Sequence, residues 1–124
     1  MTASGSVAGG SGPYWAEEDV TLANTAPLTA LSVTVTVQKT AGVAFAGQYS
    51  NFAGGALQMG HTDTASQVVY TYTLAPGQSL PAGGAWRIGS QFSGNGTAHP
   101  TSNDTFTLSA TTAGGASTTT GGHF

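Results

Sequence analysis

Carboxylates are the first residues to consider for chemistry, because the chain has no cysteine and therefore no thiol nucleophile or cysteine-ligated metal site. Glu17, Glu18 and Asp19 are consecutive, and the other two carboxylates are Asp63 and Asp104. Consecutive side chains of an extended segment alternate between faces, so the three cannot all converge. A glycoside hydrolase needs two carboxyl groups about 5–10 Å apart across a cleft, and no local spacing supplies them. We predict no catalytic residues and interpret the acidic run as a solvated strand entrance.

Histidine and carboxylate pairs are the only candidates for metal ligands. His61-x-Asp63 and His99 with Asp104 offer mixed donors to zinc, but their spacings match no compact zinc signature. Calcium at Asp104 is an open alternative, although one local carboxylate is few for a tight site. Residues 94–105 are better explained as a structured turn in which Asn and Asp cap backbone amides and His99 bonds across the loop. We therefore expect no cofactor, with a structural calcium ion as the alternative.

Aromatic rings are the other residues that suggest a ligand. A pyranose has an apolar face on which a flat ring stacks, while amide and guanidinium groups bond its hydroxyls. Rings that neighbour Gly, Pro or Asn at strand ends are candidates for exposed platforms, and packing over a sheet edge is an equal alternative. The candidate rings are Trp15, Tyr49, Phe52 and Trp86, and the candidate hydroxyl partners are Gln48, Asn51, Arg87 and Gln91.

Period-two alternation predicts the strands that must position these residues. In residues 31–38, Leu and Val alternate with Ser, Thr and Gln, which places one face on a core and the other in water. Similar alternation predicts strands near residues 19–23, 43–45, 57–59, 68–74, 86–92 and 106–110, with a short tail strand ending at Phe124. Tyr70, Tyr72, Phe92 and Phe106 fall on the apolar faces and are expected in the core.

Turn signals separate these strands. Pro27 ends the first of them, the Pro76-Gly77 turn stops the strand over 68–74, and a Gly-Asn-Gly turn at 94–96 follows the strand over 86–92. No window has helical periodicity. We predict an all-β fold, an antiparallel β-sandwich of about seven to nine strands with an immunoglobulin-like or jelly-roll-like arrangement.

Composition bounds the partners and the domain organisation. Of 124 residues only 7 are charged, 2 basic and 5 acidic, so the chain has little with which to bind nucleic acid or an anionic membrane. Its polarity comes instead from Thr and Ser, a mix that is typical of turn-rich β-structure and secreted surfaces. No segment is long and apolar enough to span a membrane. Residues 1–12 are small and polar and predict a flexible Gly/Ser linker or an expression remnant, with one module over 13–124.

Four segments resemble carbohydrate-binding β-sandwich modules of the family 2 cellulose- and chitin-binding type: 20–27 (VTLANTAP), 48–51 (QYSN), 74–80 (LAPGQSL) and 91–100 (QFSGNGTAHP). The likeness covers about residues 18–110. In that family, tryptophans on one sheet face bind crystalline polysaccharide and a disulfide often joins the chain ends. This chain has no cysteine, and Tyr49-Ser50-Asn51 stands where the family has Trp-Asn. The resemblance therefore implies only Tyr49 and Trp86 as stacking platforms.

Together the residues and the resemblance predict a non-catalytic, monomeric, secreted module. It would anchor an upstream catalytic domain, joined by a linker, to a neutral polysaccharide such as cellulose or chitin. The alternative is a structural or adhesion domain of an extracellular or cell-surface protein. For that alternative, an uncharged edge strand over residues 32–38 would invite pairing with another chain.

Overall fold

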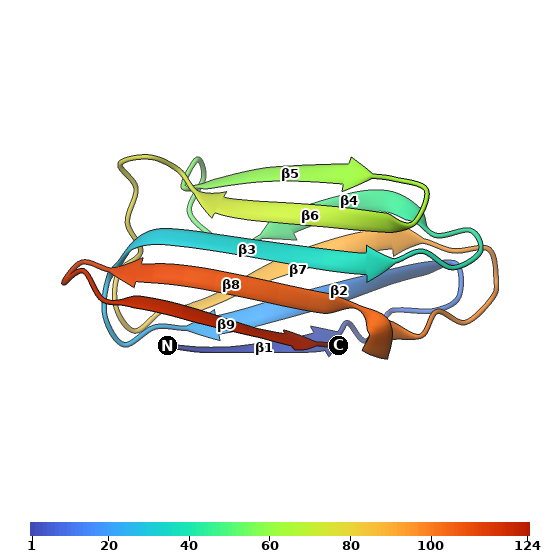
Figure 1. The fold of residues 1–124 in the computed structure, drawn as a ribbon, viewed down its shortest axis with the longest axis horizontal. Coiled ribbons are helices and arrows are strands. Elements are labelled where there is room, and N and C mark those ends of the chain that lie inside the picture. Colours follow the sequence, from blue (N-terminus) through green and yellow to red (C-terminus); the bar gives the residue numbers. More distant parts are fainter.

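The protein is a sandwich of two antiparallel sheets, described by a computed structural model of all 124 residues (Figure 1). Its elements are β1 (Thr2–Val7), β2 (Trp15–Ala23), β3 (Leu28–Gln38), β4 (Ala44–Ser50), β5 (Leu57–Asp63), β6 (Gln67–Leu74), β7 (Ala85–Ser93), the short 3-10 helix η1 (Thr101–Asn103), β8 (Thr105–Thr112) and β9 (Ser117–His123). Sheet A has the strand order β1-β2-β7-β4, and sheet B has the order β5-β6-β3-β8-β9. The predicted all-β sandwich of seven to nine strands is confirmed. No helix is long and apolar enough to cross a bilayer.

The core lies between the inward faces of the two sheets. The valines of β3 are fully buried, and Tyr70, Tyr72, Phe92 and Phe106 are buried as their positions in the alternating pattern predicted. Two tyrosine hydroxyls on sheet B also bond across the core to sheet A. Tyr70 donates to the carbonyl of Gln91 (2.5 Å), and Tyr72 donates to the carbonyl of Gly89 (2.9 Å). These bonds let the two phenol groups enter an apolar core without leaving a polar atom unpaired.

The predicted turns fix the strand boundaries. Pro27 lies between β2 and β3, and Gly77 has a φ of 78° in the turn after β6, a left-handed conformation that favours glycine. The tail strand ends at His123, one residue before the expected Phe124.

Residues 1–12 are not a flexible linker throughout, because residues 2–7 form the edge strand β1. All six residues of β1 pair with β2. Pairing of this kind depends on backbone amides and carbonyls and needs no apolar side chains, so composition did not reveal it. The missing side chain of Gly5 also matters, since a Cβ there would lie 2.8 Å from the carbonyl oxygen of His123. The backbone of β1 at Gly5 therefore lies close against β9, and these two edge strands lie together along one side of the sandwich (Figure 1).

The expectation that residues 32–38 form an edge was also wrong. They belong to β3, which pairs with β6 on one side and β8 on the other and so is the central strand of sheet B. Both sets of its backbone groups are used within the sheet, which leaves none for another chain. The edges are instead β1, β4, β5 and β9.

Candidate functional site

The pleat of β2 sends the three consecutive acids to two different faces. Glu17 and Asp19 lie opposite Gln91 and Gly89 on the outward face of sheet A, whereas Glu18 shares the inward face with Val20. All three are buried, with exposed fractions of 7%, 0% and 7% in chain order. The interpretation of this run as a solvated strand entrance is therefore wrong. Alternation of faces was predicted correctly, but the covering side chains come from distant strands that local sequence does not identify.

The outward face of sheet A holds a group of polar and aromatic side chains that we call the outer cluster: Glu17, Asp19, Tyr49, Arg87 and Gln91. Tyr49 on β4 is in register with Gly89 on β7, and its ring lies directly over that glycine. A Cβ at Gly89 would come within 2.2 Å of the ring, so only glycine permits this position. The ring thereby reaches across β7 to β2, where the Tyr49 hydroxyl donates to Glu17 Oε2 (3.0 Å).

Glu17 is the hydrogen-bonding centre of the outer cluster. Its second oxygen, Oε1, accepts from Gln91 Nε2 (2.8 Å), and the Arg87 guanidinium carbon lies 5.8 Å from the centre of the Tyr49 ring. Burial alone would raise the pKa of Glu17. Hydrogen bonds from Asp19, Gln91 and Tyr49 together lower the pKa by more than burial raises it, so the pKa lies below its ordinary value. Burial and the hydrogen bond to Glu17 raise the pKa of Asp19 to about 7. Near neutral pH, Glu17 is therefore ionised, and its negative charge lies in the same cluster as the positive charge of Arg87.

The structure brings several of the predicted binding residues to this face. Tyr49, Arg87 and Gln91 belong to the outer cluster, and Asn51 lies beside it, accepting from the Arg87 backbone amide (2.7 Å) and donating to the Ala85 carbonyl. An open depression of about 330 Å³ adjoins Asn51 and Arg87. Trp15 occupies an outward position at the start of β2 and is 39% exposed.

Three predicted residues lie outside the outer cluster. Gln48 is in register with the inward-facing Ser90 and donates to the carbonyl of Gly60 (3.2 Å). Phe52 is buried and packs on Trp86 with ring centres 5.1 Å apart. Trp86 Nε1 donates to Asn24 Oδ1 (2.9 Å), so its polar atom is already used. Phe52 therefore has the packed arrangement, whereas Trp86 is half-buried against it and lines the depression beside Asn51 and Arg87.

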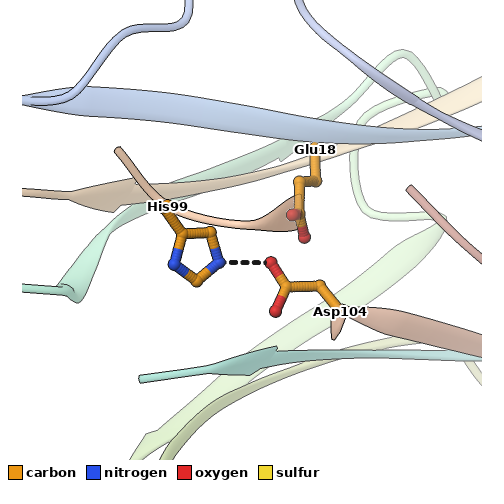
Figure 2. A group of neighbouring side chains, drawn as sticks. All are labelled: Glu18, His99 and Asp104. Atoms are coloured by element: carbon orange, nitrogen blue, oxygen red, sulfur yellow. Dashed lines mark hydrogen bonds and ion pairs between the residues drawn. The ribbon is translucent and has the colours of Figure 1, made fainter. Parts of the chain in front are cut away.

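A second group lies inside the sandwich, and we call it the inner cluster: Glu18, His99 and Asp104 (Figure 2). His99 Nε2 is hydrogen-bonded to Asp104 Oδ2 (2.6 Å), and His99 Nδ1 is hydrogen-bonded to Thr40 Oγ1 (2.9 Å). Asp104 Oδ1 accepts from the Gln38 backbone amide (2.8 Å). These bonds agree with the structured turn predicted for residues 94–105. Sequence reasoning missed Glu18, which approaches from β2.

Glu18 has no hydrogen-bond partner for either carboxyl oxygen, although its side chain is completely buried. Burial, and then the neighbouring Asp104 carboxyl, raise the pKa of Glu18 to about 11. In the absence of a cation, Glu18 is therefore the neutral acid at neutral pH.

The other histidine and carboxylate pair does not converge on one point. The His61 ring stacks on Phe45 with ring centres 3.5 Å apart. Asp63 forms an ion pair with Lys39 and accepts from the Phe45 backbone amide (3.1 Å).

No family model matches the chain, and no curated protein matches it in sequence.

Proposed function

We propose that the outward face of sheet A binds a neutral polysaccharide, such as cellulose or chitin, and that the chain is a non-catalytic carbohydrate-binding module of a secreted enzyme. The observation that carries the proposal is the half-exposed Tyr49 ring, which lies over Gly89 with Glu17, Gln91 and the Arg87 guanidinium around it. The ring supplies an apolar patch, and the groups around it supply both donors and acceptors for sugar hydroxyls. Trp15 extends the same face along β2.

The charges of the outer cluster fit an uncharged ligand. Arg87 offsets the negative charge of Glu17, so the face has no large excess of either sign. A polyanion or polycation would meet an opposing charge there, whereas a neutral glycan would not.

The arrangement of Glu17 and Asp19 argues against a role in glycoside hydrolysis. Glycosidases place their two carboxyl groups about 5–10 Å apart so that they flank the scissile bond. Glu17 and Asp19 are instead two residues apart on the same face of one strand, and each carboxyl group shifts the pKa of the other. A module that only binds still aids a linked enzyme, because it raises the enzyme's concentration near the polymer.

Retention on insoluble glycans tests the proposal. Purified protein is incubated with cellulose, chitin, xylan and starch, and its depletion from solution is measured. We expect binding to at least one glycan, and we expect Tyr49→Ala to weaken it about tenfold or more, as loss of a central aromatic contact usually does. Tyr49→Phe keeps the ring and should bind more tightly than Tyr49→Ala.

Met59→Ala is the matched control, because Met59 is 46% exposed and lies on β5 in the other sheet. It should bind like the unchanged protein. The proposal fails if no glycan retains the protein, or if Tyr49→Ala, shown by thermal unfolding to be folded, binds as well as the control.

The structural or adhesion domain is the second candidate, and the outward face of sheet B favours it. That face carries rows of Ser and Thr from β3, β6 and β8 and has no charged side chain among them. Such a surface suits an inert extracellular spacer. Sedimentation at several concentrations separates the candidates, since a stable oligomer that binds no glycan would favour this one.

A further inference from the structure

Glu18 is a buried carboxyl group that receives no hydrogen bond from the rest of the chain. Both of its carboxyl oxygens are inaccessible, and no group of the chain donates a hydrogen bond to either of them. When Glu18 is neutral, its own proton can bond the neighbouring Asp104 carboxyl, but the other oxygen of Glu18 still lacks a partner. Buried polar atoms in native proteins nearly always have a partner, and an unpartnered one costs about 1–3 kcal/mol. An orphaned carboxyl group at this depth therefore points to a partner that is not part of the chain.

The surroundings of Glu18 provide the rest of a coordination sphere. One donor atom from each of Glu18, His99 and Asp104 can be chosen so that all three lie within 4.8 Å of one another. They come from β2, from the loop after β7 and from the residue before β8, and Figure 2 shows the two carboxyl groups and the imidazole facing a common point.

Neighbouring groups fix the orientation of two of these donors. Thr40 is bonded to Nδ1 of His99, which leaves Nε2 directed into the cluster. The Gln38 backbone amide donates to Oδ1 of Asp104, which leaves Oδ2 directed the same way, where it is hydrogen-bonded to Nε2 at 2.6 Å. A bound metal ion would take the place of the proton that these two atoms share. Metal-binding imidazoles and carboxylates are commonly held by such bonds on their other polar atom.

We propose that the inner cluster binds one zinc ion, with Glu18, Asp104 and His99 Nε2 as its three protein ligands. Zinc takes nitrogen and carboxylate donors and uses three protein ligands with a water as the fourth in open sites. Its two positive charges balance two carboxylates, so the buried group becomes neutral. Calcium needs six to eight oxygen donors, which this set of one nitrogen and two carboxylates does not provide.

The ion has a route to the site. His99 lines an open pocket of about 390 Å³ between the β1–β2 loop and the loop after β7, together with Ala16 and Thr101. Glu18 and Asp104 do not line this pocket, so the metal and its water ligand would enter past the His99 side chain, which is 8% exposed. The site is on the inward side of β2, so it is separate from the outer cluster and does not depend on the glycan-binding proposal.

Zinc titration of chelator-treated full-length protein tests the assignment. Thermal unfolding is followed as zinc is added, because a ligand that binds only the folded state raises the melting temperature. Cobalt(II) is used in parallel, since a tetrahedral site gives it visible absorption that the hydrated ion lacks. Glu18→Gln is the diagnostic variant, because its amide can donate to Asp104 and so preserve the fold. His61→Gln is the matched control, as it changes an exposed histidine outside the cluster.

We expect one zinc per chain, a higher melting temperature and a cobalt spectrum in the unchanged protein and in His61→Gln. Glu18→Gln should remain folded and lose at least about tenfold in zinc affinity. The proposal is overturned if zinc does not stabilise the unchanged protein, if Glu18→Gln responds as strongly, if His61→Gln alone loses the response, or if calcium stabilises and zinc does not.

Discussion

Replacing Glu18 by Gln should remove most of the pH dependence of stability in the metal-free protein above pH 5. The Glu18 side chain is fully buried, and its folded-state pKa is raised from 4.5 to about 11. Below pH 4.5 the group is protonated in both the folded and the unfolded chain, so it favours neither. Above pH 4.5 the unfolded chain releases this proton while the folded chain keeps it, and stability falls until the pH reaches the folded pKa.

The expected size follows from these two pKa values. Each pH unit between them costs about 1.4 kcal/mol of folding free energy, so raising the pH from 5 to 8 costs about 4 kcal/mol through Glu18 alone. This is a large part of the roughly 5–15 kcal/mol that stabilises a typical domain. Asp19, whose pKa is raised from 3.8 to about 7, adds a further loss of folding stability between those two pH values. It does so in both proteins and therefore cancels in their difference.

The assay is urea unfolding at pH 5 and pH 8 with a chelator present, for the unchanged protein and Glu18→Gln. The unchanged protein should lose about 4 kcal/mol more than the variant between the two pH values. Asp63→Asn, which alters an exposed carboxylate, serves as the control and should follow the unchanged protein. If the losses of Glu18→Gln and the unchanged protein agree within about 1 kcal/mol, Glu18 is not a neutral buried acid and the reasoning is refuted.

Two further substitutions test other buried polar groups by urea unfolding. Asn24→Ala should cost about 3 kcal/mol, because the buried amide donates to two backbone carbonyls and accepts from Trp86; a loss below 1 kcal/mol would contradict this. Tyr72→Phe should cost about 1–3 kcal/mol by removing the bonds of its hydroxyl to the Gly89 carbonyl and the buried Ser90 hydroxyl, whereas Tyr14→Phe, on an exposed side chain, should stay within about 0.5 kcal/mol. Equal effects of the two tyrosine changes would show that the cross-sheet bond contributes nothing.

Much of the fold was predictable from the sequence because alternation reports burial directly. The pattern in β3 and the positions of Tyr70 and Tyr72 identified inward faces, and Pro27 and Gly77 marked turns. The order of strands within each sheet was not predictable, since it depends on which backbones pair. The Ser, Thr and Gly of β1 carry no such signal, and so its pairing with β2 was missed.

The candidate site was only partly predictable for a related reason. Tyr49, Arg87 and Gln91 were expected to bind ligand from residue type, and they do share one face. Their connection to Glu17 runs across three strands that are far apart in the chain. Glu18 meets Asp104 in the same way, through the packing of one sheet on the other.

The placement of the few charges is therefore more informative than their scarcity. Four of the five carboxyl groups are buried, and Asp63, the exposed one, pairs with Lys39. Solubility is left to Thr and Ser, so the acids are present for specific contacts rather than for hydration. Glu17 and Asp104 have such contacts within the chain. Glu18 is equally buried, but no group of the chain donates to either of its oxygens, and the zinc ion proposed above would balance its charge together with that of Asp104.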